Sequence, residues 1–211
     1  MAVDECLLEA VGQFGAPVLR FYNWSEPAAT FGYFQKYLEI ERLTPLRPLV
    51  RRPTGGGLVP HEADWTYSLA FPRAHPWYAL KARESYQRVH AWIQAAFARI
   101  GCATEMAARA RHERPGQCFA GGAEQFDLLW ERRKIAGAAQ RRTKQGLLIQ
   151  GSIQRLPGMP ARAEWQQACL ALAVEQWGVK WAELSWDSGW ENRVRELVEK
   201  KYGRAEYNQR R

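Results

Sequence analysis

The sequence predicts an α+β protein in which a mixed, mostly antiparallel sheet is covered by helices. Segments with strand character gather in the middle of the chain, and helical periodicity dominates both ends. The chain has 211 residues, which is enough for one sizeable hydrophobic core and short for two. We therefore expect one domain over residues 1–211.

The N-terminal part of the chain predicts a helix, two strands and a second helix. Apolar residues three and four apart indicate a helix over residues 1–12, closed by its last residue, a glycine. Short strands are expected at residues 20–24 and 29–33. Gly32 inside the second strand indicates that another backbone approaches closely. A short helix follows at residues 37–41.

Three successive glycines stand at residues 55–57, after a strand predicted at residues 49–52. Such a loop frees the backbone to expose its N–H groups, so it can wrap an anion or a narrow acyl chain. The alternative is a flexible hairpin turn. Alternation in the next segment, residues 65–71, predicts a half-buried strand. His61 lies between them, and an isolated histidine is more often structural than catalytic.

The clearest amphipathic helix lies at residues 89–100, and a basic, irregular stretch at residues 103–117 is expected to form an exposed loop. Cys118 follows in a glycine-flanked loop near several arginines. Nearby cations lower a thiol pKa and raise the thiolate fraction. The alternative is an inert, half-buried thiol. The remaining cysteines are expected in the core; they are Cys6, Cys102 and Cys169.

Lys134 opens the middle strand of a predicted three-stranded meander. Its flanking strands are expected at residues 126–130 and 146–153, with Glu131 and Arg132 forming a two-residue turn. Small residues after Lys134 leave room beside the backbone, so the lysine can point a cation into that space. The alternative is a surface strand with a solvated lysine. Two further helices are predicted near the C-terminus, followed by a basic tail that we expect to be frayed.

The formal net charge of +8 favours acidic partners: nucleic acid, an anionic membrane or an acidic carrier protein. The alternative is a charge that serves solubility alone. The basic residues match no nucleic-acid-binding module, and no apolar run approaches the ~20 residues that span a bilayer. The sequence contains no Cys-x-x-Cys pair, so we expect neither a zinc ribbon nor a redox motif. The N-terminus carries no secretory signal, so we expect a cytoplasmic protein with free thiols.

Two stretches together resemble the lipoate–protein ligase and octanoyltransferase family. They are Arg-Arg-Pro-Thr-Gly-Gly-Gly-Leu-Val-Pro-His at residues 51–61 and Arg-Lys-Ile-Ala-Gly-Ala-Ala-Gln-Arg-Arg at residues 133–142. The resemblance implies the biotin-protein-ligase-like catalytic fold, which is related to class II aminoacyl-tRNA synthetases. It also implies a single catalytic domain over residues 1–211, without the C-terminal accessory domain of many ligases.

The resemblance assigns roles to particular residues. Lys134 would hold the acyl carbonyl oxygen or an adenylate phosphate. Gly137 and Ala138 would let the substrate lie against the strand, and His61 matches the histidine after the family's glycine loop. Gln150 and Gly151 stand where the family often has His-Gly. The tunnel for the octanoyl or lipoyl tail would be shaped by the loop residues Arg52, Thr54, Gly55, Gly56 and Gly57.

The family divides by how the acyl group is activated. Cys118, sixteen residues before Lys134 and followed by phenylalanine, matches the nucleophile of one octanoyltransferase branch. That branch takes the acyl group from acyl carrier protein and passes it to a lysine of a lipoyl domain without a cofactor. A second interpretation is an ATP- and Mg-dependent lipoate ligase, in which Cys118 would be dispensable. A third is a non-catalytic acyl-binding module, supported by Gln150.

Overall fold

The computed structural model describes residues 1–112, 116–120 and 122–210. Its strands are β1 (Val18–Tyr22), β2 (Ala28–Phe31), β3 (Leu49–Arg51), β4 (Val59–His61), β5 (Trp65–Pro72), β6 (Glu105–Met106), β7 (Arg111–His112), β8 (Gly122–Ala123), β9 (Leu128–Trp130), β10 (Arg133–Arg142) and β11 (Gly146–Ile153). Its helices are α1 (Ala2–Phe14), α2 (Tyr37–Glu41), α3 (Pro76–Ala79), α4 (Ala82–Arg99), α5 (Arg162–Trp177), α6 (Ser188–Leu197), the π-helix η1 (Val198–Tyr202) and α7 (Ala205–Asn208).

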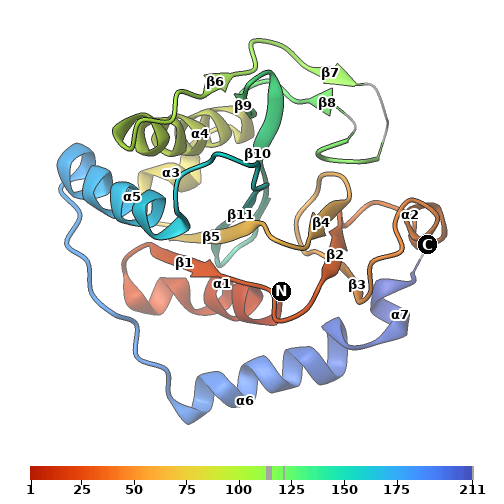
Figure 1. Cartoon of the computed structure of the whole chain (residues 1–211). Coiled ribbons are helices and arrows are strands. Elements are labelled where there is room, and N and C mark those ends of the chain that lie inside the picture. The colour runs from red at the N-terminus through yellow and green to blue at the C-terminus, as the bar shows by residue number, and fades with distance from the viewer. Residues whose placement is uncertain (113–115, 121, 211) are drawn as a thin grey trace.

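The main sheet has six strands in the order β1-β5-β11-β10-β9-β6, and every neighbouring pair is antiparallel. A smaller sheet has the order β3-β2-β4 and contains one parallel pair, β2 with β3. Helices α4 and α5 cover one face of the main sheet, and α1 covers the other (Figure 1). The predicted class, a mixed and mostly antiparallel sheet flanked by helices, is confirmed.

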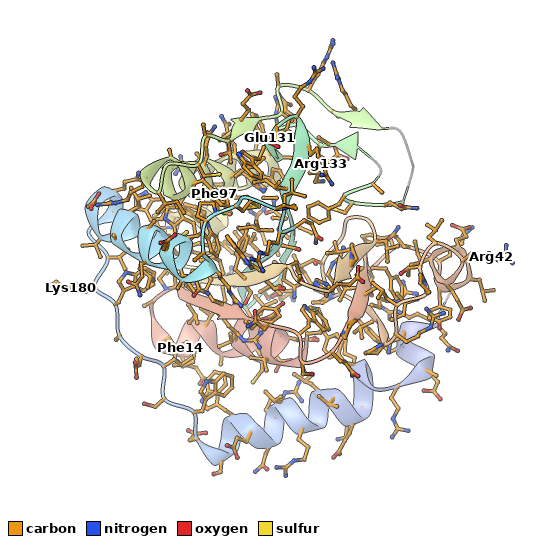
Figure 2. All side chains as sticks on the ribbon, viewed as in Figure 1. Phe14, Arg42, Phe97, Glu131, Arg133 and Lys180 are labelled. Atoms are coloured by element: carbon orange, nitrogen blue, oxygen red, sulfur yellow. The ribbon has the colours of Figure 1, made fainter. Side chains whose placement is uncertain are left out.

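The core fills the layer between the main sheet and helices α4 and α5. The rings of Trp65 and Phe97 stack with centroids 6.2 Å apart, and Trp165 packs against both. Figure 2 shows Phe97 inside this layer, whereas Arg42 and Lys180 project outward at the edges of the molecule. The helix predicted at residues 89–100 is therefore a core helix, as its apolar face indicated.

Strand β5 is buried along its whole length, so the prediction of a half-buried strand was wrong. Its two faces are both covered, because α1 packs on one and α4 and α5 lie over the other. The polar positions of the alternating pattern are small hydroxyl residues that hydrogen-bond internally. Ser68 donates to Asp4, and Thr66 donates to Asp64.

The two strands predicted at residues 20–24 and 29–33 belong to different sheets. Strand β1 pairs with β5, whereas β2 is the centre of the small sheet. A further strand, β4, was not predicted and carries His61 at its end. The stretch expected to be an exposed loop contains the short strands β6 and β7, and residues 113–115 of that stretch lie outside the described residues.

The described residues of the C-terminal tail are held against the body of the protein, so the expectation that the tail frays was wrong. Arg51 of β3 is completely buried and donates hydrogen bonds to the carbonyl oxygens of Tyr207, Asn208 and Arg210. The side chain of Asn208 in turn accepts from the Arg51 backbone N–H at 2.9 Å. The tail is fixed because its carbonyl groups accept hydrogen bonds from the buried Arg51 guanidinium.

Candidate active site

The glycine loop is held rigidly and is not the flexible hairpin of the alternative interpretation. A Cβ placed on Gly32 would lie 1.9 Å from the carbonyl oxygen of Gly56, which confirms the close approach expected at Gly32. Gly56 has φ +85°, a conformation that glycine adopts without strain. The buried guanidinium of Arg52 donates to the carbonyl oxygens of Gly55 and Gly57 at 2.9 and 2.8 Å. The loop is therefore wrapped around a buried cation.

The segment carrying Cys118 is attached directly to the end of this loop. The Leu58 N–H donates to the Gly116 carbonyl at 2.7 Å, and the Cys118 N–H donates to the Leu58 carbonyl at 2.9 Å. A Cβ on Gly57 would lie 2.9 Å from the Gly116 oxygen and 3.0 Å from the Cys118 nitrogen. Only a glycine at position 57 leaves room for the cysteine segment to approach this closely.

Lys134 joins Cys118 to a buried carboxylate. Its Nζ lies 3.3 Å from the Cys118 Sγ and 2.6 Å from Asp127 Oδ2. The Lys134 side chain is only 6% exposed and that of Asp127 is fully buried. The alternative of a solvated surface lysine is therefore wrong. The ring of Phe119 lies 5.1 Å from Nζ and covers the ammonium on another side.

The electrostatics of the thiol differ from the expectation based on the neighbouring arginines. Burial raises the pKa of Cys118, and the positive charges of Lys134 and Arg52 only partly offset this. Burial by itself would lower the pKa of Lys134, but Cys118, once it is a thiolate, and the Asp127 carboxylate outweigh this and raise that pKa. Lys134 is therefore a persistent ammonium, and Cys118 rests as a thiol beside it.

A β-bulge in β10 sets the direction of Lys134. The register between β10 and β9 shifts between Lys134 and Ala136, and such bulges redirect side chains near active sites. As a result, a Cβ on Gly137 would lie 3.1 Å from Lys134 Cε and 3.4 Å from Asp127 Oδ1. Gly137 thus leaves space for the Lys134–Asp127 pair.

Cys118 lines a narrow, mostly apolar cavity of about 40 Å³ between the glycine loop, β10 and β11. Most of the predicted site residues line it: Arg52, Gly56, Gly57, His61, Cys118, Gly137, Ala138, Gln150 and Gly151. Lys134 instead lines a broader cavity of about 680 Å³, which also has Arg132, Arg133 and Arg155 in its wall. The Cys118–Lys134 contact therefore lies where a narrow apolar cavity meets a wide basic one.

His61 belongs to a buried hydrogen-bond chain that ends at the glycine loop. Its Nδ1 lies 2.8 Å from Asp64 Oδ2, and its Nε2 lies 2.8 Å from the Thr30 hydroxyl, which accepts from Arg52. Burial lowers the pKa of His61 more than Asp64 raises it, so the ring is neutral. The neutral ring donates from Nδ1 to the carboxylate and accepts at Nε2 from Thr30. His61 thereby supports Arg52.

Gln150 and Thr54 form a second buried network. The Thr54 hydroxyl donates to Gln150 Oε1 at 2.8 Å, and Gln150 Nε2 donates to Asp4 Oδ2 at 2.7 Å. Gly151 is required for packing, since a Cβ there would lie 2.1 Å from Cζ of Tyr67. Two predicted site residues, Thr54 and Gly55, do not line the narrow cavity. Thr54 contacts it through its hydrogen bond to Gln150, and a Cβ on Gly55 would meet nothing within 4 Å.

Comparison with known proteins identifies the family of this chain. Residues 1–155 match the model of the lipoyl protein ligase A/B catalytic domain, which is well over half of the 211 residues. The chain belongs to this family. Among curated relatives, octanoyltransferase LipM of Carboxydothermus hydrogenoformans is 37% identical over 161 residues, and that of Staphylococcus aureus is 35% identical over 166 residues. Each alignment covers 72% of this chain.

The chain spans only 59% of the length of the first of these relatives and 60% of the second. Two solved structures share the fold of this lipoyl protein ligase A/B family member. A lipoate–protein ligase A bound with ATP has a TM-score of 0.78 at 20% identity, covering 99% of this chain and 92% of that one. The bipartite lipoate protein ligase of Thermoplasma acidophilum has a TM-score of 0.70 at 19% identity, covering 98% and 91%.

Three buried carboxylates that contact the predicted site residues were not predicted from the sequence. Asp4, Asp64 and Asp127 are all buried, and each hydrogen-bonds a predicted site residue. Only Asp64 left a signal, because it follows His61 at a spacing of three. No helix of the described chain is long and apolar enough to cross a membrane.

Proposed function

We propose that this family member moves an octanoyl group, or a lipoyl group, from acyl carrier protein through a thioester on Cys118 to a lysine of a lipoyl domain. The observation that carries the proposal is the Cys118 thiol, 3.3 Å from the Lys134 ammonium, in the wall of a narrow apolar cavity. An apolar lining suits an acyl tail, and a cysteine beside a fixed cation suits covalent acyl transfer.

In the first step, the Cys118 sulfur attacks the carbonyl carbon of the carrier thioester. The bond from that carbon to the carrier sulfur breaks, and the carrier thiolate takes up the proton that Cys118 gave up. In the second step, the target amine attacks the Cys118 thioester, an amide forms, and the amine proton returns to the sulfur. The Lys134 ammonium stabilises the negative charge that develops on the carbonyl oxygen in both steps.

No activating nucleotide is required by this scheme, because a thioester is already activated. The relatives named octanoyltransferase support it, at 37% and 35% identity. The net charge of +8 suits an acidic carrier protein and an acidic lipoyl domain. Both proteins are expected in the cytoplasm, where we also expect this chain.

A specific observation favours a second candidate, an ATP- and Mg-dependent lipoate ligase. The two solved structures that share the fold are ligases, one bound with ATP and one described as bipartite. A ligase of this kind would form an acyl-adenylate, with Lys134 against its phosphate, and its accessory domain could be on another chain. Cys118 would then be dispensable.

The test is transfer of an octanoyl or a lipoyl group to a purified lipoyl domain, measured by intact mass. One reaction contains octanoyl carrier protein without ATP, and the other contains free lipoate with Mg-ATP. We expect ATP-free modification of the lipoyl domain by the wild type and none by Cys118→Ala. Modification only in the ATP reaction, unchanged in Cys118→Ala, would establish the ligase. Binding of carrier protein without modification in either reaction would indicate a non-catalytic acyl-binding module.

A further inference from the structure

Asp127 is a buried carboxylate whose oxygens are all engaged, although it is not part of either sequence motif. Its Oδ2 accepts from Lys134 Nζ at 2.6 Å and from the Glu124 N–H at 2.5 Å. Its Oδ1 accepts from the hydroxyl of Tyr86. A fully buried carboxylate with this set of donors holds one orientation.

Tyr86 is itself fixed from two elements. It lies in α4, where its ring packs against His90 with centroids 4.3 Å apart. Its hydroxyl accepts from the Ala138 N–H of β10 at 3.3 Å. Strand β9 pairs with β10 only as far as Ala136, so the hydroxyl satisfies a strand N–H beyond the end of that pairing. Tyr86 therefore locks Asp127 to the same strand that carries Lys134.

We propose that Asp127, clamped by Tyr86, is the positioning residue that aims the Lys134 ammonium at Cys118. The inference rests on the proposed function, since it assigns the lysine's orientation to an acyl transfer at that sulfur. A lysine side chain has four rotatable bonds, and a buried ammonium needs a paired anion to remain charged. Asp127 supplies the anion at a distance shorter than that between Lys134 and the thiol.

The charges that act on the Cys118 thiol come from Lys134, Asp127 and Arg52. His90 contributes none at neutral pH, because burial lowers its pKa to about 4. Burial and the Asp127 charge raise the pKa of Tyr86, which keeps its hydroxyl protonated. The positive charge of Arg52 also lowers the pKa of the thiol. The described titratable and charged groups that interact with the pair or the thiol are Tyr67, Tyr86, His90 and Arg52.

The test compares Asp127→Asn and Tyr86→Phe with a matched control, Tyr78→Phe. The asparagine keeps one oxygen as an acceptor for the Glu124 N–H, removes the charge, and places an NH2 group where Oδ1 accepted from Tyr86. Tyr78 also donates one hydroxyl hydrogen bond, to the Thr143 carbonyl at 2.9 Å, but lies outside the network. Two readouts are taken on the full chain: the pH midpoint of Cys118 alkylation by iodoacetamide, and the rate of octanoyl uptake from octanoyl carrier protein.

Asp127→Asn is expected to raise the alkylation midpoint by about one pH unit, because the Lys134 ammonium is no longer held beside the thiolate. Its octanoyl uptake is expected to fall about 100-fold, the effect of a misplaced group at a reacting centre. Tyr86→Phe leaves the charges in place, so we expect a wild-type midpoint and an uptake about tenfold slower. Tyr78→Phe is expected to match the wild type in both readouts.

The outcomes separate this inference from the proposed function. If the wild type takes up octanoate and both network variants do so at its rate, positioning by Asp127 is wrong and the transferase stands. If the wild type takes up none, the transferase is wrong, and alkylation decides the positioning. A raised midpoint in Asp127→Asn then supports the positioning of Lys134 at Cys118, and an unchanged or lowered midpoint overturns it.

Discussion

Substitution of Gly57 by alanine is expected to impair acyl uptake by Cys118 while leaving most of the fold intact. The new Cβ would lie 2.9 Å from the Gly116 oxygen and 3.0 Å from the Cys118 nitrogen, both backbone atoms. Relief of this contact requires the cysteine segment to move away from the glycine loop. That movement strains two backbone hydrogen bonds, from Leu58 to Gly116 and from Cys118 to Leu58.

Each weakened hydrogen bond is worth about 1 kcal/mol, so the destabilisation is expected to be about 1–2 kcal/mol. The catalytic cost is larger, because a shift of about 1 Å at a reacting group lowers rates about 100-fold. Gly55→Ala in the same loop is the matched control, since a Cβ there meets nothing within 4 Å. The assay is quenched-flow mass spectrometry of octanoyl uptake, with thermal unfolding measured alongside. A folded Gly57→Ala protein that takes up octanoate at the rate of Gly55→Ala would refute this reasoning.

Three other predictions concern stability. Gly151→Ala would place a Cβ 2.1 Å from Cζ of Tyr67, and such overpacking costs about 1–3 kcal/mol; urea unfolding checks this, and a midpoint equal to that of the wild type would contradict it. The pKa of His90 is lowered by burial from 6.5 to about 4. The unfolded chain therefore binds a proton that the folded chain does not as pH falls from 6.5 towards 4. Stability is expected to decrease on the order of 3 kcal/mol over that window, and His90→Gln should flatten the dependence; an equally steep decrease in His90→Gln would show that other groups cause it. Arg51→Ala removes the donor that holds the last carbonyls of the tail. Limited trypsin digestion is expected to cleave this variant after Arg204 faster than the wild type, and equal rates would argue against the anchor.

The sequence predicted the local elements well where a pattern within a few residues determines them. The meander is one example: β9, β10 and β11 are adjacent and antiparallel. The two-residue turn at Glu131 and Arg132 is another, with φ values of 48° and 64° that match the twist of a tight hairpin. The resemblance also selected Cys118 and Lys134, and the structure brings them to 3.3 Å.

Features that depend on distant parts of the chain could not be predicted. Asp4 and Gln150 are 146 residues apart in sequence and hydrogen-bond in the core, and no local signal relates them. Regular alternation would place Lys134 and Gly137 on opposite faces of a strand. The bulge in β10 brings them together instead, and bulges leave little trace in a sequence of small residues.

The burial of β5 illustrates the same limit. Its alternating pattern is typical of a strand with one solvent-exposed face. In this protein, α1 covers the face that carries Ser68. The buried carboxylate of Asp4 accepts from this serine at 2.8 Å and from Arg20 at 2.8 Å. Although burial would raise the pKa of Asp4, nearby positive charge, including Arg20, lowers it. The polar positions of β5 therefore mark buried hydrogen-bond partners and not a face exposed to solvent.

The central claim is that Cys118 carries the acyl group, and peptide mapping of the trapped intermediate tests it most directly. The protein is mixed with octanoyl carrier protein without ATP, quenched in acid, digested and analysed by tandem mass spectrometry. We predict one octanoyl group on the peptide that contains Cys118, removed by neutral hydroxylamine, and none on peptides that contain Cys6, Cys102 or Cys169. These three thiols are buried in the core. An octanoyl group on another residue, or transfer to the lipoyl domain by Cys118→Ala, would contradict the account.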